Sequence, residues 1–417
     1  MKEQIKQDFK KLITNSNFSK KNIEIKKENF NRFVENGFPN KREESWKFSD
    51  LSQIISKNIK NLTFYNDLSK SNQVDESIFI DKLEHNKLVF VNGRIEKIDF
   101  KYEEKDKIEI NEDYNLFNEK NIANSLLSLN KAFLNKCFKL TVKKNYNFNK
   151  PLIIYNITNN QLESTNLSLR IDIELQENSF LKLINLFNDS SNSNFINVNY
   201  QFNIKENSVL KNYKIDKKLN SNIKYFYTNI DQELNSIAEV FIMSSGSKFL
   251  RNEINCNLNG EYSSSFVNGI INLNGSQHHE IKANLNHFAE NTKSYQLVKS
   301  VLKDEAKSVF QGKIYVNEKA QKTDAYQLSK TILLNDNTEF NAKPELEIYA
   351  DDVKCSHGSA SGNLDENSIF YLMSRGLSFE DAKNLLISGF LLDVIDKITD
   401  IEIKTLIKKI IGFKEWT

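Results

Sequence analysis

Residues 167–175 (LSLRIDIEL) and residues 196–204 (INVNYQFNI) decide the fold class, because apolar and polar side chains alternate along both stretches. Alternation with a period of two places each apolar set on one face of a β-strand. The second stretch begins 29 residues after the first (196 − 167). The following turn returns at the same offset, since residues 176–182 (QENSFLK) are echoed by residues 205–211 (KENSVLK). The alternation of the strand and the sequence of the turn therefore recur at the same interval of 29 residues.

A repeat of strand and turn with no helix between the copies is typical of a β-solenoid, in which each rung buries its apolar face against the next. The alternative is a β-sandwich, which does not require that both alternation and turn sequence recur at one offset. The sequence favours a mainly β fold with a β-solenoid as its core. The open ends of such a core need a cover, which the flanking segments can provide.

The chain is expected to have three parts: residues 1–125, 126–358 and 359–417. The first is a mixed α/β domain with helices over residues 2–14 and 26–36 and a strand and turn at residues 87–94 (KLVFVNGR). The second is the β-helix core. The third is a helical domain, in which Ser378 and Asp400 are expected to cap helices.

Composition excludes several function classes. The 417 residues contain 57 Lys and Arg and 55 Asp and Glu, a net charge of +2, which leaves no dominant basic field for nucleic acid or an anionic membrane. Three widely spaced cysteines (Cys137, Cys256 and Cys355) suit a reducing compartment, and the polar N-terminus predicts no signal peptide. We expect a cytoplasmic protein. The phosphate-loop pattern GxxxxGK[ST] is absent, so nucleotide hydrolysis is not expected.

The histidine-rich stretch at His278, His279, Glu280 and His287 suggests a metal site at first sight. His279 and His287 would share one face of a continuous strand, but eight residues at ~3.4 Å each place them about 27 Å apart. One ion cannot bind both. The sequence therefore favours structural histidines at these positions.

A second candidate site lies near the end of the predicted core, at Cys355 and His357. In a strand, these two residues lie on one face with Cα atoms about 7 Å apart. A thiolate and an imidazole suit iron, zinc or a nascent iron–sulfur cluster, but two ligands do not complete a site. The others would come from a partner or a neighbouring rung. A half-buried cysteine beside a turn histidine, or a nucleophilic Cys–His pair, remain alternatives.

The region around this pair resembles the SufB/SufD family of iron–sulfur cluster assembly proteins. The resemblance is carried by residues 343–358 (KPELEIYADDVKCSHG), 310–314 (FQGKI), 320–325 (AQKTDA), 364–366 (LDE), 370–372 (FYL) and 374–376 (SRG). Residues 42–48 (REESWKF) match an N-terminal element of the SufD branch. SufB-type proteins carry a cysteine where this chain has Leu328 and an acidic residue where it has Lys354, and both departures also favour SufD.

The resemblance implies a right-handed parallel β-helix between an N-terminal domain and a C-terminal helical domain, in a non-enzymatic scaffold subunit. It implies pairing with a SufB-like paralogue through the terminal β-helix strands and binding of a SufC-like ABC ATPase through the C-terminal helices. A homodimer is possible when the chain is alone. Cys355 and His357 map onto the family's interface pair, which would hold transient iron or a nascent cluster shared with the partner. Reduced flavin is associated with the complex, but no residue here is assigned to it.

One departure is that the usual HGAT reads HGSA here, so Ala360 replaces the family threonine. Three alternatives stay open beside a SufD-type function. The chain could be a SufB-type paralogue, or a purely structural partner whose Cys-x-His is inert. It could also be a carbohydrate-active β-helix enzyme, which would need clustered carboxylates on a groove.

Overall fold

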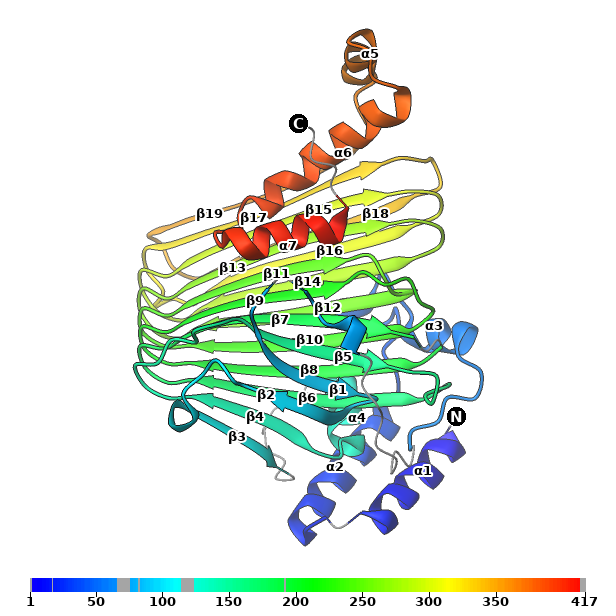
Figure 1. Cartoon of the computed structure of the whole chain (residues 1–417), viewed down its shortest axis with the longest axis vertical. Coiled ribbons are helices and arrows are strands. Elements are labelled where there is room, and N and C mark those ends of the chain that lie inside the picture. The colour runs from blue at the N-terminus through cyan, green and yellow to red at the C-terminus, as the bar shows by residue number, and fades with distance from the viewer. Residues whose placement is uncertain are drawn as a thin grey trace.

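The chain coils into a parallel β-solenoid with helices at both ends, as this computed structural model shows (Figure 1). The structure describes residues 2–16, 18–65, 76–81, 83–113, 124–190 and 193–412. The mainly β solenoid predicted from the repeat is confirmed, with about eight turns.

The solenoid has two sheets that take strands alternately. The ten-stranded sheet contains β1 (Asn86–Val91), β2 (Arg94–Asp99), β5 (Leu152–Thr158), β7 (Phe180–Asp189), β9 (Val209–Asp216), β11 (Ile237–Ser244), β13 (Ser264–Leu273), β15 (Lys293–Leu302), β17 (Thr323–Leu333) and β19 (Val353–Gly362). The nine-stranded sheet contains β3 (Ile108–Asp113), β4 (Cys137–Val142), β6 (Asn166–Leu175), β8 (Phe195–Ile204), β10 (Ile223–Gln232), β12 (Phe249–Leu258), β14 (His278–His287), β16 (Lys307–Val316) and β18 (Glu339–Ile348). From β4 onward, consecutive strands of the chain belong alternately to the two sheets. This order excludes a sandwich built from antiparallel hairpins.

The repeat in the sequence corresponds to the pairing of strands in successive rungs of the solenoid. Strands β6 and β8 pair in parallel, with Leu167 opposite Ile196 and Leu175 opposite Ile204, so the offset of 29 residues is one rung. The alternate apolar side chains face the interior and form the main core. The echoed turns recur because Asn178 and Asn207 both adopt the left-handed backbone conformation, with φ of 56° and 57°. Asparagine tolerates this conformation better than most residues.

Four helices cover part of the nine-stranded sheet: α1 (Lys2–Asn15), α2 (Lys20–Asn36), α3 (Leu51–Asn58) and α4 (Ser125–Phe133). They bury a cluster that includes Phe195, Tyr225 and Phe249 near the starts of β8, β10 and β12. Helix α2 begins six residues earlier than predicted (26 − 20), because the Ser19 side chain caps it by accepting a hydrogen bond from the Asn22 N–H.

The predicted start of the core at residue 126 falls inside α4, and the strand that follows begins at Cys137. Asn124 caps this helix through the N–H of Leu126. Conversely, β1, β2 and β3 lie before residue 126 and already belong to the two sheets. At the far end, β19 continues to Gly362. The β-structure thus begins before residue 126 and ends after residue 358.

The C-terminal helices are α5 (Glu366–Ser374), α6 (Phe379–Ile395) and α7 (Ile401–Ile411). Ser378 and Asp400 cap α6 and α7, as predicted. Helix α7 and the last turns of α6 pack on the outer face of the ten-stranded sheet, where Lys299 pairs with Asp393 at 2.7 Å. Helix α5 and the first turns of α6 extend beyond the last rung (Figure 1).

Candidate functional site

The last rung of the solenoid carries the candidate pair. Strands β17 and β19 pair in parallel, with Cys355 opposite Ala325 and His357 opposite Gln327. Cys355 is half-buried and packs against a small cluster that includes Ile314 and Ala350, whereas His357 is exposed. The two residues are separated by one position on the terminal strand and therefore lie on the same face of it.

The protonation of Cys355 depends on its surroundings. Burial and the nearby Asp324 carboxylate raise the pKa of the Cys355 thiol above its ordinary value, and a hydrogen bond with the Ala325 backbone partly offsets this. The free chain therefore holds a thiol at neutral pH. A metal ion that binds there has to displace the proton, since the thiolate is the ligand.

The pair does not form a complete metal site by itself. Within the ranges that the structure describes, no three His, Cys, Asp or Glu side chains lie close enough to hold one ion. Cys355 and His357 thus supply two donors, one sulfur and one nitrogen. Further donors would have to come from another chain or from other residue types.

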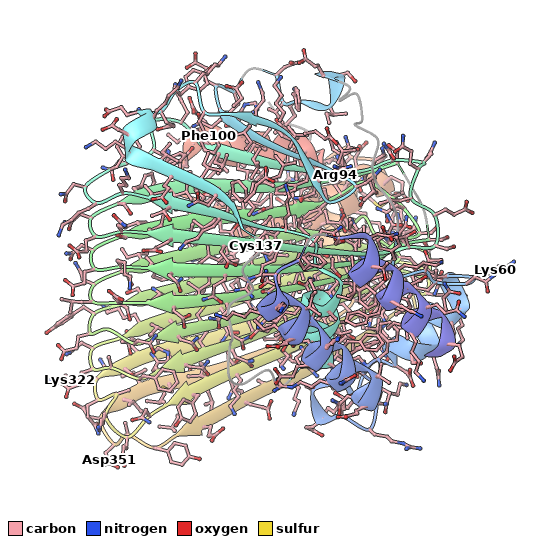
Figure 2. All side chains as sticks on the ribbon, turned by 90° about the horizontal axis from the view of Figure 1, so that it is seen from below. Lys60, Arg94, Phe100, Cys137, Lys322 and Asp351 are labelled. Atoms are coloured by element: carbon pink, nitrogen blue, oxygen red, sulfur yellow. The ribbon has the colours of Figure 1, made fainter. Side chains whose placement is uncertain are left out.

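The rung that carries the pair is much less buried than the rung before it. Strands β18 and β19 are the last strands of their sheets, and neither contains a buried residue, whereas most residues of the preceding strand β16 are buried. Figure 2 shows the turns stacked along one side, with Lys322 and Asp351 in those of the final rungs. A terminal strand exposes backbone groups that can pair with another chain.

The segment that projects beyond this rung is strongly apolar at its surface. We call residues 366–388, which comprise α5 and the first part of α6, the C-terminal arm. Its exposed large side chains are Phe370 (75% exposed), Tyr371 (56%), Phe379 (49%) and Met373 (43%). A gathering of exposed aromatic side chains of this size marks an interaction surface.

The sequence favours structural histidines in β14, and the contacts of His279 and His287 agree with this interpretation. His279 and His287 lie at opposite ends of β14 and are fully buried. Both ring nitrogens of His279 contact protein oxygens at 2.7 Å, one from Ser244 and one from Ser247. Those of His287 contact Thr292 and Ser294.

Two residues near the pair were not identified as site residues from the sequence. Gln327 lies directly under His357 in the rung below, and the Asp324 carboxylate acts on Cys355. The rung offset of 30 residues at this point (357 − 327) is the signal that could have located Gln327. Leu328, the position of a cysteine in SufB-type proteins, contacts the apolar cluster beneath the C-terminal helices.

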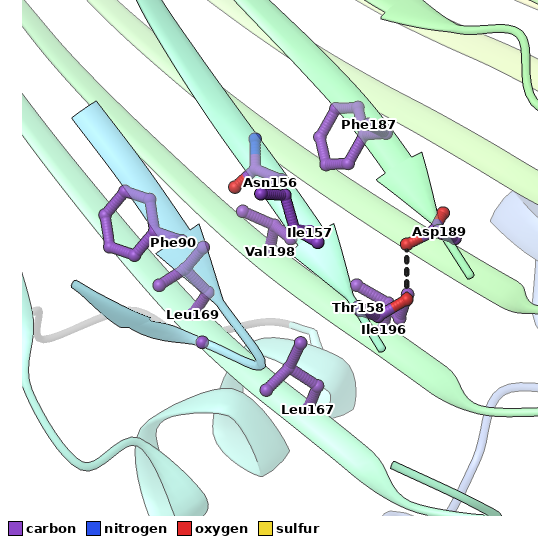
Figure 3. Close-up of a pocket in the computed structure, with 11 residues that line it drawn as sticks. Phe90, Asn156, Ile157, Thr158, Leu167, Leu169, Phe187, Asp189, Ile196 and Val198 are labelled. Atoms are coloured by element: carbon purple, nitrogen blue, oxygen red, sulfur yellow. Dashed lines mark hydrogen bonds between the residues drawn. The ribbon is translucent and has the colours of Figure 1, made fainter. Parts of the chain in front are cut away.

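A small cavity lies in the first rungs of the solenoid, away from the candidate pair. Its lining includes Phe90, Asn156, Phe187 and Asp189, and Thr158 donates a hydrogen bond to Asp189 beside it (Figure 3). The cavity is almost entirely apolar and carries no reactive group that points to chemistry. In the described part of the chain, no helix is long and apolar enough to cross a membrane.

Comparison with known proteins gives a consistent result. The family model described as "SUF system FeS cluster assembly, SufBD core domain" matches residues 156–390. The iron–sulfur cluster assembly protein SufD of Escherichia coli is 26% identical over 390 residues, which cover 91% of this chain and 90% of that protein.

Shorter matches include both branches of the family. An iron–sulfur cluster assembly SufBD family protein of Synechocystis is 33% identical over 175 residues, 41% of this chain and 38% of the relative. The SufB protein of Bacillus subtilis is 27% identical over 159 residues, 38% of this chain and 34% of the relative. The chain therefore belongs to the SufB/SufD family of iron–sulfur cluster assembly proteins and is similar to SufD over nearly its whole length.

Proposed function

We propose that this chain is the SufD-type subunit of a cytoplasmic SUF assembly complex, in which Cys355 and His357 help to hold iron or a nascent cluster at the contact with a SufB-type partner. The observation that carries the proposal is the position of both side chains on the exposed last rung. A partner strand that continues the sheet beyond β19 would bring its own donors to this rung.

The donor set suits iron as a transient cargo. A thiolate and an imidazole are ligands that iron accepts, and two donors leave coordination positions open for a second subunit. The raised pKa of the Cys355 thiol favours release of the metal when protons compete for sulfur. The subunit thus offers a place to hold iron briefly, and it acts as a scaffold without catalysing a reaction of its own.

The C-terminal arm is the proposed docking surface for a SufC-type ABC ATPase. Helix α7 and the end of α6 are already occupied by the ten-stranded sheet, so the arm is the part of the C-terminal helices that is free to bind another protein. Its exposed aromatic side chains supply the apolar contact area that such an interface needs. The absence of a phosphate loop from the sequence fits a division of labour in which the partner hydrolyses ATP.

The test is anaerobic purification of the chain with SufB-type and SufC-type partners, followed by iron and sulfide analysis. The variants are Cys355→Ala and His357→Ala, with Ser361→Ala as a matched control, because Ser361 is exposed on the same face of β19. We expect loss of iron and sulfide in the first two variants, with the complex intact, and wild-type content in the control.

The rival hypothesis, a purely structural SufD-type subunit, makes the opposite prediction. Wild-type iron and sulfide in both Cys355→Ala and His357→Ala would support it and remove the site from the proposal. A chain purified alone tests the homodimer, since the exposed edge of β19 could also pair with a second copy of itself.

A further inference from the structure

The turns on one side of the solenoid are stacked and joined by hydrogen bonds. They connect each strand of the nine-stranded sheet to the next strand of the ten-stranded sheet. The Asn235 N–H donates to the Glu261 backbone oxygen at 2.8 Å. In the next turn, the Tyr262 N–H donates to the Glu290 backbone oxygen at 3.3 Å. Successive turns are therefore held about 4.8 Å apart, on the side of the solenoid away from α1 and α2 (Figure 2).

Exposed apolar side chains gather on these turns. Leu234, Tyr262 and Phe288 come from three consecutive turns and are 40%, 56% and 41% exposed. The ring of Phe288 packs on that of Tyr315 near the end of β16, with 5.7 Å between centroids, and Tyr315 packs on Tyr349 at 5.9 Å. We call these five residues the apolar ridge, which runs from the rung of β10 to that of β18 and is about 19 Å long. A row of exposed apolar side chains of this extent marks an interaction surface.

Tyr262 is held in a backbone conformation that does not suit tyrosine. Its φ is 58°, in the left-handed region. The matching turn positions one rung below and one rung above are Asn235 and Asn291, with φ of 54° and 57°. Asparagine tolerates this region, whereas a bulky residue there is an outlier that the rest of the structure has to maintain. Backbone strain of this kind clusters at functional sites, so the exposed tyrosine points to a contact outside the chain.

The apolar ridge is bordered by acidic side chains. Seven carboxylates and three lysines give these turns a net charge of −4. The turns lie at residues 205–208, 233–236, 259–263, 288–292, 317–322 and 349–352. The turns on the opposite side carry a net charge of +1, counted over residues 217–222, 245–248, 274–277, 303–306 and 334–338. Glu206, Glu261 and Glu290 are exposed and form no ion pair within the described residues, so they are available to a basic partner.

We propose that the apolar ridge is a docking surface for a partner protein, which binds through an extended segment that carries both basic and apolar side chains. The carboxylates complement lysine or arginine, and the rings offer flat faces to proline and aliphatic side chains. One apolar side chain in each rung makes the surface long and narrow, which fits an extended segment better than a globular face. The inference goes beyond the proposed function and needs neither Cys355 nor His357.

The probe is a fluorescein-labelled peptide of four Lys-Pro-Leu repeats, whose prolines favour an extended conformation. Binding to the full chain is measured by fluorescence anisotropy at physiological ionic strength. Peptides of four Glu-Pro-Leu repeats and four Lys-Pro-Ser repeats reverse the charge and remove the apolar side chains, respectively. The variants are Phe288→Ser and Tyr262→Asn, which restores the residue type of the neighbouring turns. Leu219→Ser is the matched control, because Leu219 is 66% exposed in a turn on the opposite side.

We expect the Lys-Pro-Leu peptide to bind the wild type about tenfold more tightly than either other peptide. Tyr262→Asn and Phe288→Ser should each weaken its binding by about tenfold, and Leu219→Ser should leave it unchanged. The thermal stability of Tyr262→Asn should equal or exceed that of the wild type, because asparagine adopts the left-handed conformation more readily. A tyrosine retained for packing would instead lower the stability when it is replaced.

Equal affinities for the three peptides would overturn the inference, and so would wild-type affinity in both Tyr262→Asn and Phe288→Ser. Equal binding of the Lys-Pro-Leu and Lys-Pro-Ser peptides would also overturn it, because an acidic surface alone accounts for that result. Self-association of the wild type that Tyr262→Asn abolishes would assign the apolar ridge to a second copy of this chain and overturn the proposed partner.

Discussion

The guanidinium carbon of Arg251 lies 4.1 Å from the ring centroid of Trp46, which connects the N-terminal segment to the middle of the solenoid. Arg251 is fully buried, pairs with Glu280, and donates a hydrogen bond to the backbone oxygen of Ser45 at 2.7 Å. The element at residues 42–48, which resembles part of SufD, is therefore explained by packing: its tryptophan covers a buried charge.

Replacement of Trp46 by alanine should destabilise the protein. Trp46 is 2% exposed, and loss of a buried tryptophan typically costs 3–5 kcal/mol, here with loss of the cation–π contact to Arg251. We expect a lower midpoint in chemical unfolding of Trp46→Ala. The variant Trp46→Phe keeps an aromatic ring at this position and should lose less stability than Trp46→Ala. Equal unfolding midpoints for all three proteins would contradict this role.

Acid should destabilise the solenoid through His279. Burial lowers the pKa of His279 to about 4 from about 6.5 in the unfolded chain, so the unfolded state binds more protons between these values. The stabilisation is complete above pH 6.5 and is lost as the pH falls toward 4, by roughly 3 kcal/mol in total. Groups that act on this ring are Asp216, His278 and Lys224.

The measurement is the free energy of unfolding between pH 7.5 and 4.5, by urea titration. The free energy of unfolding of the wild type should change most steeply with pH below pH 6.5. The change should be smaller in His279→Gln, because the glutamine side chain does not bind a proton. His287, whose pKa burial lowers to about 3, contributes a residual slope in both proteins. An identical pH profile for the variant would show that His279 does not carry the effect.

Polar substitution in the C-terminal arm should weaken binding of the proposed SufC-type ATPase and leave the fold intact. Phe370 and Tyr371 are exposed, so Phe370→Ser and Tyr371→Ser change few internal contacts. We expect unchanged thermal unfolding and at least a tenfold loss of affinity in calorimetric titration with the SufC-type protein. Ile401→Ser is the control, because Ile401 is 79% exposed on α7, outside the arm. An equal loss in the control would show that the arm is not the specific contact.

Two glycine-to-alanine variants should change stability in opposite directions. Gly312→Ala places a methyl group against Gln327 and Phe310 and should destabilise by about 1–3 kcal/mol. Gly389 lies in helix α6 with open space around it, so Gly389→Ala should stabilise by about 0.5–1 kcal/mol. Differential scanning calorimetry of the pair checks both signs, and a shift in the same direction for both would refute the packing argument for Gly312.

The repeat in the sequence was sufficient to predict the register of the core. The pairing of Leu167 with Ile196 follows from alternation and offset alone, because side-chain direction in a strand is fixed by position. The placement of Cys355 and His357 on one strand also followed from their spacing. The residue in register with His357 on the neighbouring strand could not be predicted in this way, since the position of Gln327 depends on the length of the rung at that point.

Other features depend on tertiary contacts that no periodic pattern contains. Helix α6 is apolar along most of its length, so its sequence does not reveal that Leu391 and Val394 pack on the sheet while Phe379 remains exposed. The interior of the solenoid also contains Lys224, held between Asp189 and Asp216. Charged side chains facing inward oppose the usual hydrophobic pattern, and only the neighbouring rungs supply their partners.

In a stack of rungs, each layer is stabilised only by the layers next to it, and the layer formed by β18 and β19 has a neighbour on one side alone. This layer should therefore open before the rest, and a copy without a partner should present a loosened internal segment to cellular proteases. If the proposed partner covers this layer, degradation of the uncovered copies would match the number of free subunits to that of the partner.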